Sequence, residues 1–255
     1  MAEVNILVTN DDGIYSAGIF ELAKALKSLG NVQIVAPLAE KSAVGHAITV
    51  SDPLRVSEIE RNGDFFGYAV NGTPADCVKI AVKCILDKEP DIIVSGINQG
   101  SNTATNVIYS GTVSAAAEGV ILGVPAIAVS LVSFTQKDFS YAGKVAHQIA
   151  AQVLENGLPP RTLLNVNVPS LPEKDIIDVV PARQGEGRYE EMFDKREDPY
   201  GRTYYWMAGK RMILDKDDDV DDVVVMQNKV AVTPIQYDLT HHDFLKELSK
   251  WKLKP

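Results

Sequence analysis

Two adjacent carboxylates, Asp11 and Asp12, follow the first apolar run of the chain. The run from Val4 to Val8 is short, unalternating and rich in β-branched residues, which is typical of a strand buried on both faces of a parallel sheet. Open α/β sheets bind ligands at the carboxyl ends of their strands, and paired carboxylates there can hold a divalent cation or accept a proton. The same residues also suit an ordinary turn before a helix, because Asp and Gly13 are common in turns.

Two other loops carry oxygen donors that such a sheet would bring to the same place, Ser42 and Asn98. Each follows a strand that is expected to flank the first one, so the three loops converge at one crevice. Carboxylate, hydroxyl and amide oxygens suit Mg²⁺ or Mn²⁺, and the lack of nearby Cys or paired His disfavours zinc. We expect one divalent ion on these four residues, where it would polarise a phosphate oxygen and activate water. Asp11 or Asp12 is the candidate proton acceptor.

Ser110, Gly111 and Thr112 open a helix of small residues and can offer hydroxyls and free backbone N–H groups to a phosphate. The alternative is a plain serine N-cap followed by a permissive glycine. Asn10 and His46 are candidates for support behind the ligands, although a hydrogen-bonded loop histidine without a role in the site is the simpler interpretation of His46.

The elements that must position these residues alternate along the chain, which predicts a Rossmann-like, doubly wound α/β fold with a mostly parallel sheet. The predicted strands are Val4–Val8, Val32–Ala36, a hairpin of Leu54–Glu60 and Phe65–Val70, then Asp91–Ser95, Ala126–Leu131, Leu163–Val168 and Val230–Ile235. The predicted helices are Ala17–Leu29 with Gly30 as C-cap, one from Thr73 that points Cys77 and Cys84 into the core, Val113–Leu122, Tyr141–Leu154 and His242–Trp251. Residues 96 to 109 are predicted to form a loop.

The segment from Ala182 to Asp219 shows no useful helical or strand period and is rich in charges and aromatic residues. It suggests an extended arm that packs on a partner subunit, with a disordered insert as the alternative. The acidic run Asp215–Asp222 lacks the Gly and Glu of an EF-hand and is predicted to be a solvated turn before a short helix. We therefore divide the chain into a core at 1–181, an arm at 182–228 and a terminal strand and helix at 229–255.

The composition, with 45% hydrophobic residues among 255, indicates an ordinary globular protein. A formal net charge of −9 argues against binding to a nucleic-acid polymer. We expect no membrane association, because no apolar run is long enough to span a bilayer, and a cytoplasmic location, because no signal peptide is recognisable. Cys77 and Cys84 are too far apart along a helix to form a disulfide with each other, which suits a reducing compartment.

Several motifs together resemble the survival protein SurE family over essentially the whole chain. They are NDDG at 10–13, AP....S..GHAIT at 36–49, GTPADCV at 72–78, PDIIVSGIN.G.N at 90–102, VIYSGTVSAA.EG at 107–119 and VTPI at 232–235. The resemblance implies a divalent-metal-dependent phosphatase that acts on nucleoside 5′- and 3′-monophosphates, in some members also on polyphosphate. It also implies homodimers or homotetramers that exchange C-terminal elements.

By position, the resemblance implies metal ligation by Asp11, Asp12, Ser42 and Asn98, and phosphate contacts by Asn102, Ser110, Gly111 and Thr112. The chain departs from the family pattern at two places. Ala104 and Asn106 stand where Gly and Asp are common, which removes a negative charge near the site. Leu38 and Ala39 stand where Asp and Arg are frequent, so the phosphate would lack a basic partner there unless Lys41 supplies one.

A non-hydrolytic module that binds metal or nucleotide is the rival interpretation, since phospho-receiver domains also place paired acids after their first strand. A receiver needs a phospho-acceptor Asp after its third strand and a Lys after its fifth. Here those strands lead into Ser95-Gly96 and Val132-Ser133, which favours the phosphatase.

Overall fold

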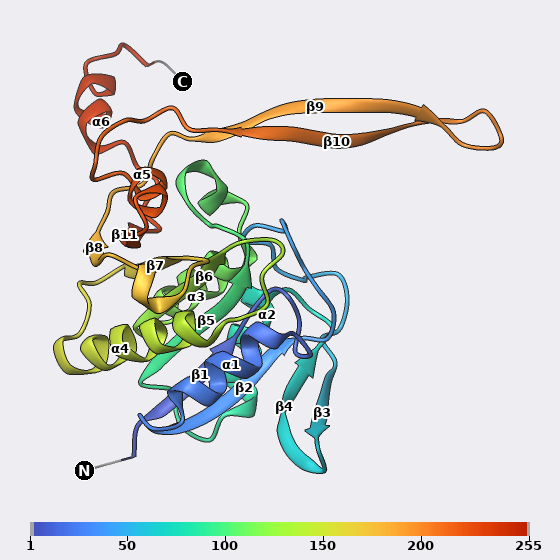
Figure 1. Ribbon diagram of the computed structural model, residues 1–255, viewed down its shortest axis with the longest axis vertical. Helices are drawn as coiled ribbons and strands as arrows, with labels where there is room; N and C mark the ends of the chain where they lie inside the picture. The colour runs from blue at the N-terminus through green and yellow to red at the C-terminus, as the bar shows by residue number, and fades with distance from the viewer. Residues whose placement is uncertain (1–2, 254–255) are drawn as a thin grey trace.

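A nine-stranded sheet runs through the body of the protein in the computed structural model, which describes residues 3–253 (Figure 1). From one edge to the other the strands are β3 (Val56–Arg61), β4 (Asp64–Val70), β2 (Asn31–Pro37), β1 (Asn5–Thr9), β5 (Ile92–Gln99), β6 (Ala126–Val132), β7 (Thr162–Pro169), β11 (Val230–Gln236) and β8 (Val179–Pro181). The strands from β4 to β7 are parallel, whereas β3 pairs antiparallel with β4, and β11 pairs antiparallel with β7 and parallel with β8. β1 lies between β2 and β5, as predicted, so the loops after these three strands open at one edge.

Helices cover both faces of this sheet (Figure 1). α1 (Ala17–Leu26) packs with α4 (Ser140–Asn156) on one face, and α2 (Pro74–Ile80) packs with α3 (Gly111–Ile121) on the other. Each face has its own apolar core, because the central strands are buried on both sides: Ile6 and Val8 of β1 belong to one core and Leu7 to the other. The predicted doubly wound, mostly parallel α/β fold is confirmed.

A long antiparallel hairpin of β9 (Arg188–Glu197) and β10 (Thr203–Met212) projects from the body and forms the predicted arm (Figure 1). The segment forms two strands although its sequence shows no strand period, and the alternative of a disordered insert is wrong. Both strands are exposed over almost their whole length, with Trp206 at 60% exposure. The hairpin therefore lacks the alternation of apolar and polar residues that a half-buried strand shows.

The first helix is shorter than predicted, and Gly30 is not its C-cap. α1 ends at Leu26, and the chain reaches β2 through a turn in which the Leu29 N–H donates to the Leu26 carbonyl at 2.9 Å. A Cβ atom on Gly30 would lie 2.2 Å from the carbonyl oxygen of Val4. Glycine is therefore required at position 30 because the chain passes too close to Val4, just before the neighbouring strand, to leave room for a side chain.

Cys84 is exposed, which corrects the prediction that both cysteines face the core. α2 passes into a π-helical turn, η1 (Ala81–Ile85), where the Leu86 N–H donates to the Ala81 carbonyl at 2.9 Å. The extra residue in this turn rotates the side chains that follow it off the face that buries Cys77.

The predicted loop at residues 96 to 109 is partly ordered into regular structure. β5 continues through Gln99, and a 3₁₀ helix, η2 (Ala104–Ile108), precedes α3. Another 3₁₀ turn is η3 (Glu173–Asp175), while α5 (Asp221–Met226) and α6 (His242–Leu248) flank β11 in sequence. Within residues 3–253, no helix combines the length and apolar character needed to cross a bilayer.

Candidate active site

The loops after β1, β2 and β5 meet at the carboxyl edge of the sheet, as the sequence predicts. The backbone N–H of Lys41, in the loop after β2, donates to the carbonyl of Asp11 at 2.7 Å. The backbone N–H of Gln99, at the end of β5, donates to Oδ2 of Asp12 at 3.2 Å. These contacts bring the loops of Ser42 and Asn98 against the paired carboxylates.

Asn10 fixes the shape of the loop that carries the two carboxylates. Its buried Nδ2 donates to the Gly13 carbonyl at 3.0 Å and to Oγ of Ser16 at 2.8 Å, and Ser16 is the N-cap of α1. Gly13 has φ +91°, a conformation that side-chain-bearing residues rarely adopt. Asn10 thus lies where the sequence places a supporting residue.

The start of α3 packs directly on Asp11. The hydroxyl of Thr112 donates to Oδ1 of Asp11 at 2.5 Å, and a Cβ on Gly111 would lie 2.7 Å from the Asp11 Cβ. Ser110 is the N-cap of this helix, and its Oγ accepts from the Val113 N–H at 3.1 Å. Ser110 therefore caps the helix while the same turn packs against the Asp11 carboxylate. Gly111 is required for this packing, because a side chain at 111 would collide with Asp11.

Burial raises the pKa values of both carboxyl groups. For Asp11, burial outweighs the opposing hydrogen bond from Thr112. For Asp12, burial and then the charge of Asp11 raise the pKa to about 6. The charge of Glu40 raises both further. A buried and a half-buried carboxylate on adjacent residues favour a bound cation, which would relieve their repulsion.

The neutral donors complete an oxygen-rich set. Nδ2 of Asn98 donates to the Gly100 carbonyl at 2.8 Å, which leaves its Oδ1 to act as a ligand. Ser42 is exposed, and its hydroxyl donates to Oε1 of Glu40 at 2.6 Å. Among residues 3–253 no three His, Cys, Asp or Glu side chains cluster as metal ligands do, so a cation here needs hydroxyl or amide donors as well. Glu40, two residues before Ser42, is a site-facing carboxylate that sequence reasoning missed.

Asn102 is held from the core by polar side chains of two strands. Its Nδ2 donates to Ser130 on β6 at 2.9 Å, and its carbonyl accepts from Asn165 and Asn167 on β7 at 2.7 and 3.1 Å. The backbone N–H of Asn102 donates to Oδ1 of Asn167 at 2.9 Å. Sequence reasoning missed Asn165 and Asn167, although two asparagines within an otherwise apolar, buried strand were a usable signal.

His46 contacts a buried acid on α3. Its Nε2 lies 2.9 Å from Oε2 of Glu118, whose other oxygen accepts from Lys79 at 2.6 Å. Burial raises the pKa of Glu118, but the hydrogen bonds from His46 and Lys79 outweigh it and the net shift is downward. The Gly45 N–H donates to the Tyr109 carbonyl at 2.9 Å, so the loop of His46 also lies beside the start of α3.

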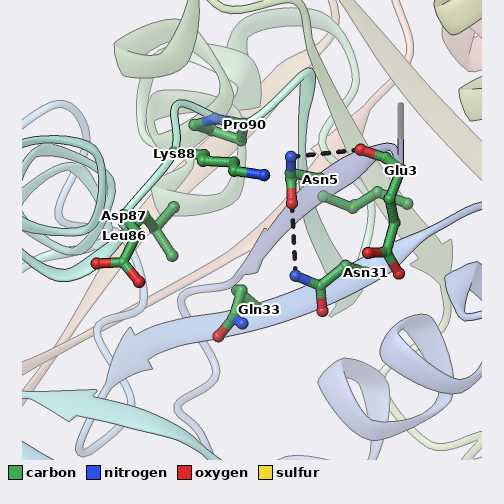
Figure 2. Close-up of a pocket in the computed structure, with 9 residues that line it drawn as sticks. Glu3, Asn5, Asn31, Gln33, Leu86, Asp87, Lys88 and Pro90 are labelled. Atoms are coloured by element: carbon green, nitrogen blue, oxygen red, sulfur yellow. Dashed lines mark hydrogen bonds between the residues drawn. The ribbon is translucent and has the colours of Figure 1, made fainter. Parts of the chain in front are cut away.

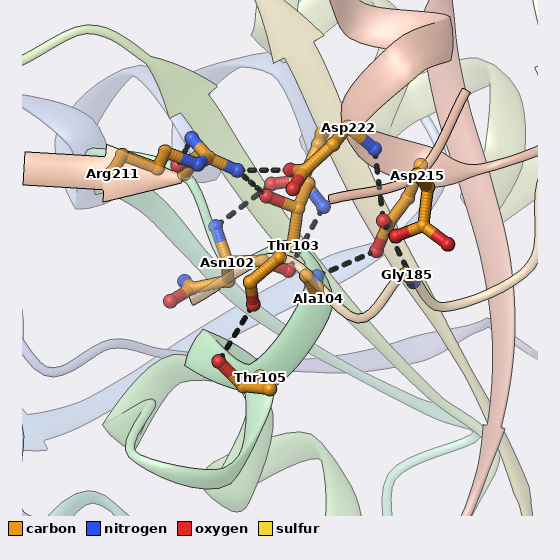
Figure 3. A network of polar contacts seen from close by, with 12 residues as sticks. Asn102, Thr103, Ala104, Thr105, Gly185, Arg211, Asp215 and Asp222 are labelled. Carbon is orange, nitrogen blue, oxygen red and sulfur yellow. Dashed lines mark hydrogen bonds and ion pairs between the residues drawn. The ribbon is translucent and has the colours of Figure 1, made fainter. Parts of the chain in front are cut away.

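The end of the acidic run is buried, which corrects the prediction of a solvated turn. Asp221 and Asp222 are 0% and 2% exposed, and both belong to a polar network with Arg211 and the loop of Asn102 (Figure 3). The acids that stay in solvent, as predicted, are Asp217, Asp218 and Asp219, while Asp215 is half-buried. The spacing of acids within the run could not show that Asp221 and Asp222 bind residues in other parts of the chain.

The pockets at the opposite edge of the sheet contain none of these residues. One of about 200 Å³ lies at the amino ends of β1 and β2, where Asn31 donates to Asn5 at 3.4 Å (Figure 2). Another of about 400 Å³ lies before β6 and β7, beside Pro125 and Thr162. Both are at the wrong end of the strands for the site described above.

Comparison with known proteins identifies the family of this chain. The family model described as Survival protein SurE matches residues 6–191. A 5'-nucleotidase SurE of Chlorobium limicola is 50% identical over 98% of this chain and 97% of its own length, and one of Syntrophobacter fumaroxidans is 48% identical over 98% and 100%. The crystal structure of the SurE protein from Aquifex aeolicus superposes with a TM-score of 0.85 at 41% identity, covering 96% of this chain and 98% of that one. The chain therefore belongs to the survival protein SurE family.

Proposed function

We propose that this protein is a divalent-metal-dependent phosphatase that releases phosphate from nucleoside 5′-monophosphates. The observation that carries the proposal is the contact between Thr112 and Asp11, which joins a helix start suited to phosphate to a pair of carboxylates suited to a cation. The names of the relatives, 5'-nucleotidase SurE, support the substrate class. We extend the proposal to nucleoside 3′-monophosphates and to short polyphosphate, which present the same terminal phosphate group.

The donor set fits one Mg²⁺ or Mn²⁺ ion per subunit, with Asp11, Asp12, Ser42 and Asn98 as its ligands. When bound, the ion would supply Lewis-acid polarisation of the phosphate ester. Asp11 or Asp12, whose pKa values are raised, would accept a proton from an attacking water.

The phosphate would lie on the start of α3. Ser110 offers its hydroxyl, which acts only as an acceptor in the helix cap, and Gly111 lets the backbone approach because it carries no Cβ. Thr112, whose hydroxyl donates to Asp11, would contact the phosphate from the same turn of the helix. Asn102 approaches from the loop after β5, and the helix dipole favours the negative charge that redistributes during the reaction. Asn10 and His46 would act behind these groups, Asn10 by shaping the carboxylate loop and His46 by joining the Ser42 loop to α3 through Glu118.

We also propose that the protein forms a homodimer or homotetramer through residues 182–228. The hairpin exposes large apolar side chains along its length, and exposed aromatic residues among charges are typical of contact surfaces. A monomer by light scattering would contradict this assignment. A cytoplasmic location is supported by the two free cysteines of the described chain.

Phosphate release from a panel of nucleoside 5′- and 3′-monophosphates and short polyphosphate, with Mg²⁺, Mn²⁺ or EDTA, tests the function. We expect metal-dependent release that Asp11→Asn reduces at least a thousandfold in a folded protein. Asp87→Asn is the matched control, since this exposed acid lies at the opposite edge of the sheet. No release from any substrate by folded, metal-replete protein would favour a non-hydrolytic metal- or nucleotide-binding module instead.

A further inference from the structure

Arg211 lies where the hairpin joins the body and reaches back to the loop that carries Asn102 (Figure 3). Its Nη1 donates to Oγ of Ser101 at 2.6 Å, and its Nη2 donates to Oγ1 of Thr103. One guanidinium group thus holds the hydroxyls on both sides of Asn102. The separation in sequence is 110 residues for the contact with Ser101.

The charge of Arg211 is compensated within the protein. Nη2 also pairs with Oδ1 of Asp222, whose side chain is 0% exposed, while that of Arg211 is 27% exposed. A guanidinium that is already paired with a buried carboxylate contributes little net charge to a phosphate nearby. Its planar fork of donors nevertheless fixes the two hydroxyls, which a lysine ammonium on a flexible stem does not do in the same geometry.

Other residues at the base of the hairpin hold the same loop by its backbone. The Ala104 N–H donates to Asp221 at 2.9 Å, and the Ala104 carbonyl accepts from Gln184 at 2.8 Å. Thr105 donates through its hydroxyl to the Gly187 carbonyl at 2.8 Å. The core therefore fixes Asn102 itself. The residues on either side of Asn102 are fixed by the root of the hairpin, which consists of Gln184, Gly187, Arg211, Asp221 and Asp222.

We propose that Arg211 is a positioning residue of the phosphate site, which sets phosphate affinity by fixing Ser101 and Thr103 around Asn102. The proposal rests on the function proposed above. It makes the root of the hairpin part of the active site, because Arg211 holds the hydroxyls on both sides of Asn102. Asp11 and Asp12 are not in contact with Arg211, so the metal site remains intact when the arginine changes.

Two variants test this inference in the full-length protein. Arg211→Lys keeps a positive charge beside Asp222 but loses the fork. Ser101→Ala combined with Thr103→Val leaves the Arg211–Asp222 pair in place and removes only the hydroxyls it holds, so this variant decides the question if Arg211→Lys fails to fold. Arg196→Lys is the matched control, because Arg196 lies on the hairpin and pairs with exposed Asp194.

The measurements are Mn²⁺ affinity, affinity for inorganic phosphate in the presence of Mn²⁺ by calorimetry, and KM and kcat for a nucleoside 5′-monophosphate. We expect phosphate affinity to fall and KM to rise about tenfold in both test variants, with Mn²⁺ affinity within about twofold of the wild type and kcat less affected than KM. The control keeps wild-type values. Unchanged phosphate affinity in the folded test variants overturns the inference.

The two proposals fail in different ways. If the wild-type protein binds Mn²⁺ and phosphate but hydrolyses no nucleotide, the phosphatase function is wrong, while the calorimetric comparison still decides the role of Arg211. If the wild-type protein hydrolyses nucleotides and the test variants bind phosphate as it does, only the role of Arg211 is wrong. A wild-type protein that neither binds phosphate nor hydrolyses nucleotides overturns both.

Discussion

The hydroxyl of Thr112 donates a 2.5 Å hydrogen bond to Oδ1 of Asp11, which is 101 residues away in sequence. Both groups are buried, and the bond is charge-assisted when the carboxyl group is ionised. It orients a proposed metal ligand and at the same time seats the start of α3 on the carboxylate loop. The metal and phosphate halves of the site are thus joined by one contact.

Replacing Thr112 by Val should weaken metal binding and turnover about tenfold to a hundredfold, the usual effect of removing a hydrogen bond that orients a metal ligand. Valine keeps the volume of threonine, so the free energy of unfolding should change far less than activity does. Mn²⁺ titration and steady-state kinetics check this. Thr112→Ser, which keeps the hydroxyl, should retain most activity, and equal losses in both variants would contradict the assigned role.

Replacing Gly111 by Ala should impair catalysis by crowding Asp11. The added Cβ would lie 2.7 Å from the Asp11 Cβ and 2.9 Å from Oδ2, so either the helix start or the carboxylate must move. We expect a loss of at least tenfold in kcat/KM. Gly143→Ala on α4 is the control, because its nearest contact would be a side-chain methyl at 3.2 Å. If Gly111→Ala had wild-type kinetics, position 111 would not lie as close to Asp11 as the structure shows.

Replacing Asp12 by Asn should raise the Tm of the metal-free protein at neutral pH, because it removes a half-buried charge that is disfavoured by desolvation and by the charge of Asp11. Saturating Mn²⁺ should stabilise the wild type by about 2.7 kcal/mol at a concentration of a hundred times Kd, and the variant hardly at all. Thermal unfolding with Mn²⁺ and with EDTA measures both effects. If Mn²⁺ stabilised the two proteins equally, Asp12 would not be a metal ligand.

Asp76 should make stability depend on acid pH. Burial raises its pKa, but hydrogen bonds from Thr49 and Thr73 outweigh burial and the net shift is below the ordinary value of 3.8. The folded state therefore favours the ionised form, so this stabilisation is present above pH 3.8 and is lost as pH falls through the lowered folded pKa.

Asp76→Asn tests that pH dependence. It should cost about 1–2 kcal/mol of unfolding free energy at neutral pH, since it breaks the capping box of α2 and the bonds to Thr49. The difference from the wild type should shrink as the pH is lowered through the range of the carboxyl pKa. Exposed Asp52→Asn is the control and should leave stability unchanged at every pH. If the difference in unfolding free energy between the wild type and Asp76→Asn grew as the pH was lowered, the pKa of Asp76 would be raised in the folded state and the prediction would be wrong.

The buried strands, the central place of β1 and the convergence of three loops on Asp11 and Asp12 follow from the sequence alone. These features depend on local composition and on the general rule that parallel strands bind ligands at their carboxyl ends. The arm was also predictable as a segment, but its strands were not, because a hairpin exposed on both faces does not produce an alternating pattern. Cys84 was misplaced because a π-turn shifts the helical phase, which an ideal period does not anticipate.

Only the tertiary structure shows which distant side chains share these sites. Arg211 donates hydrogen bonds to Ser101 and Thr103. The side chains that hold Asn102 come from β6 and β7. Glu118 contacts both Lys79 and His46. Hydrogen-bond partners separated by many residues depend on the relative placement of whole elements, which no local spacing encodes. The sequence by itself therefore determined the sheet and the two carboxylates at its edge. The packing of α3, β7 and the root of the hairpin decided how the groups around those carboxylates are held.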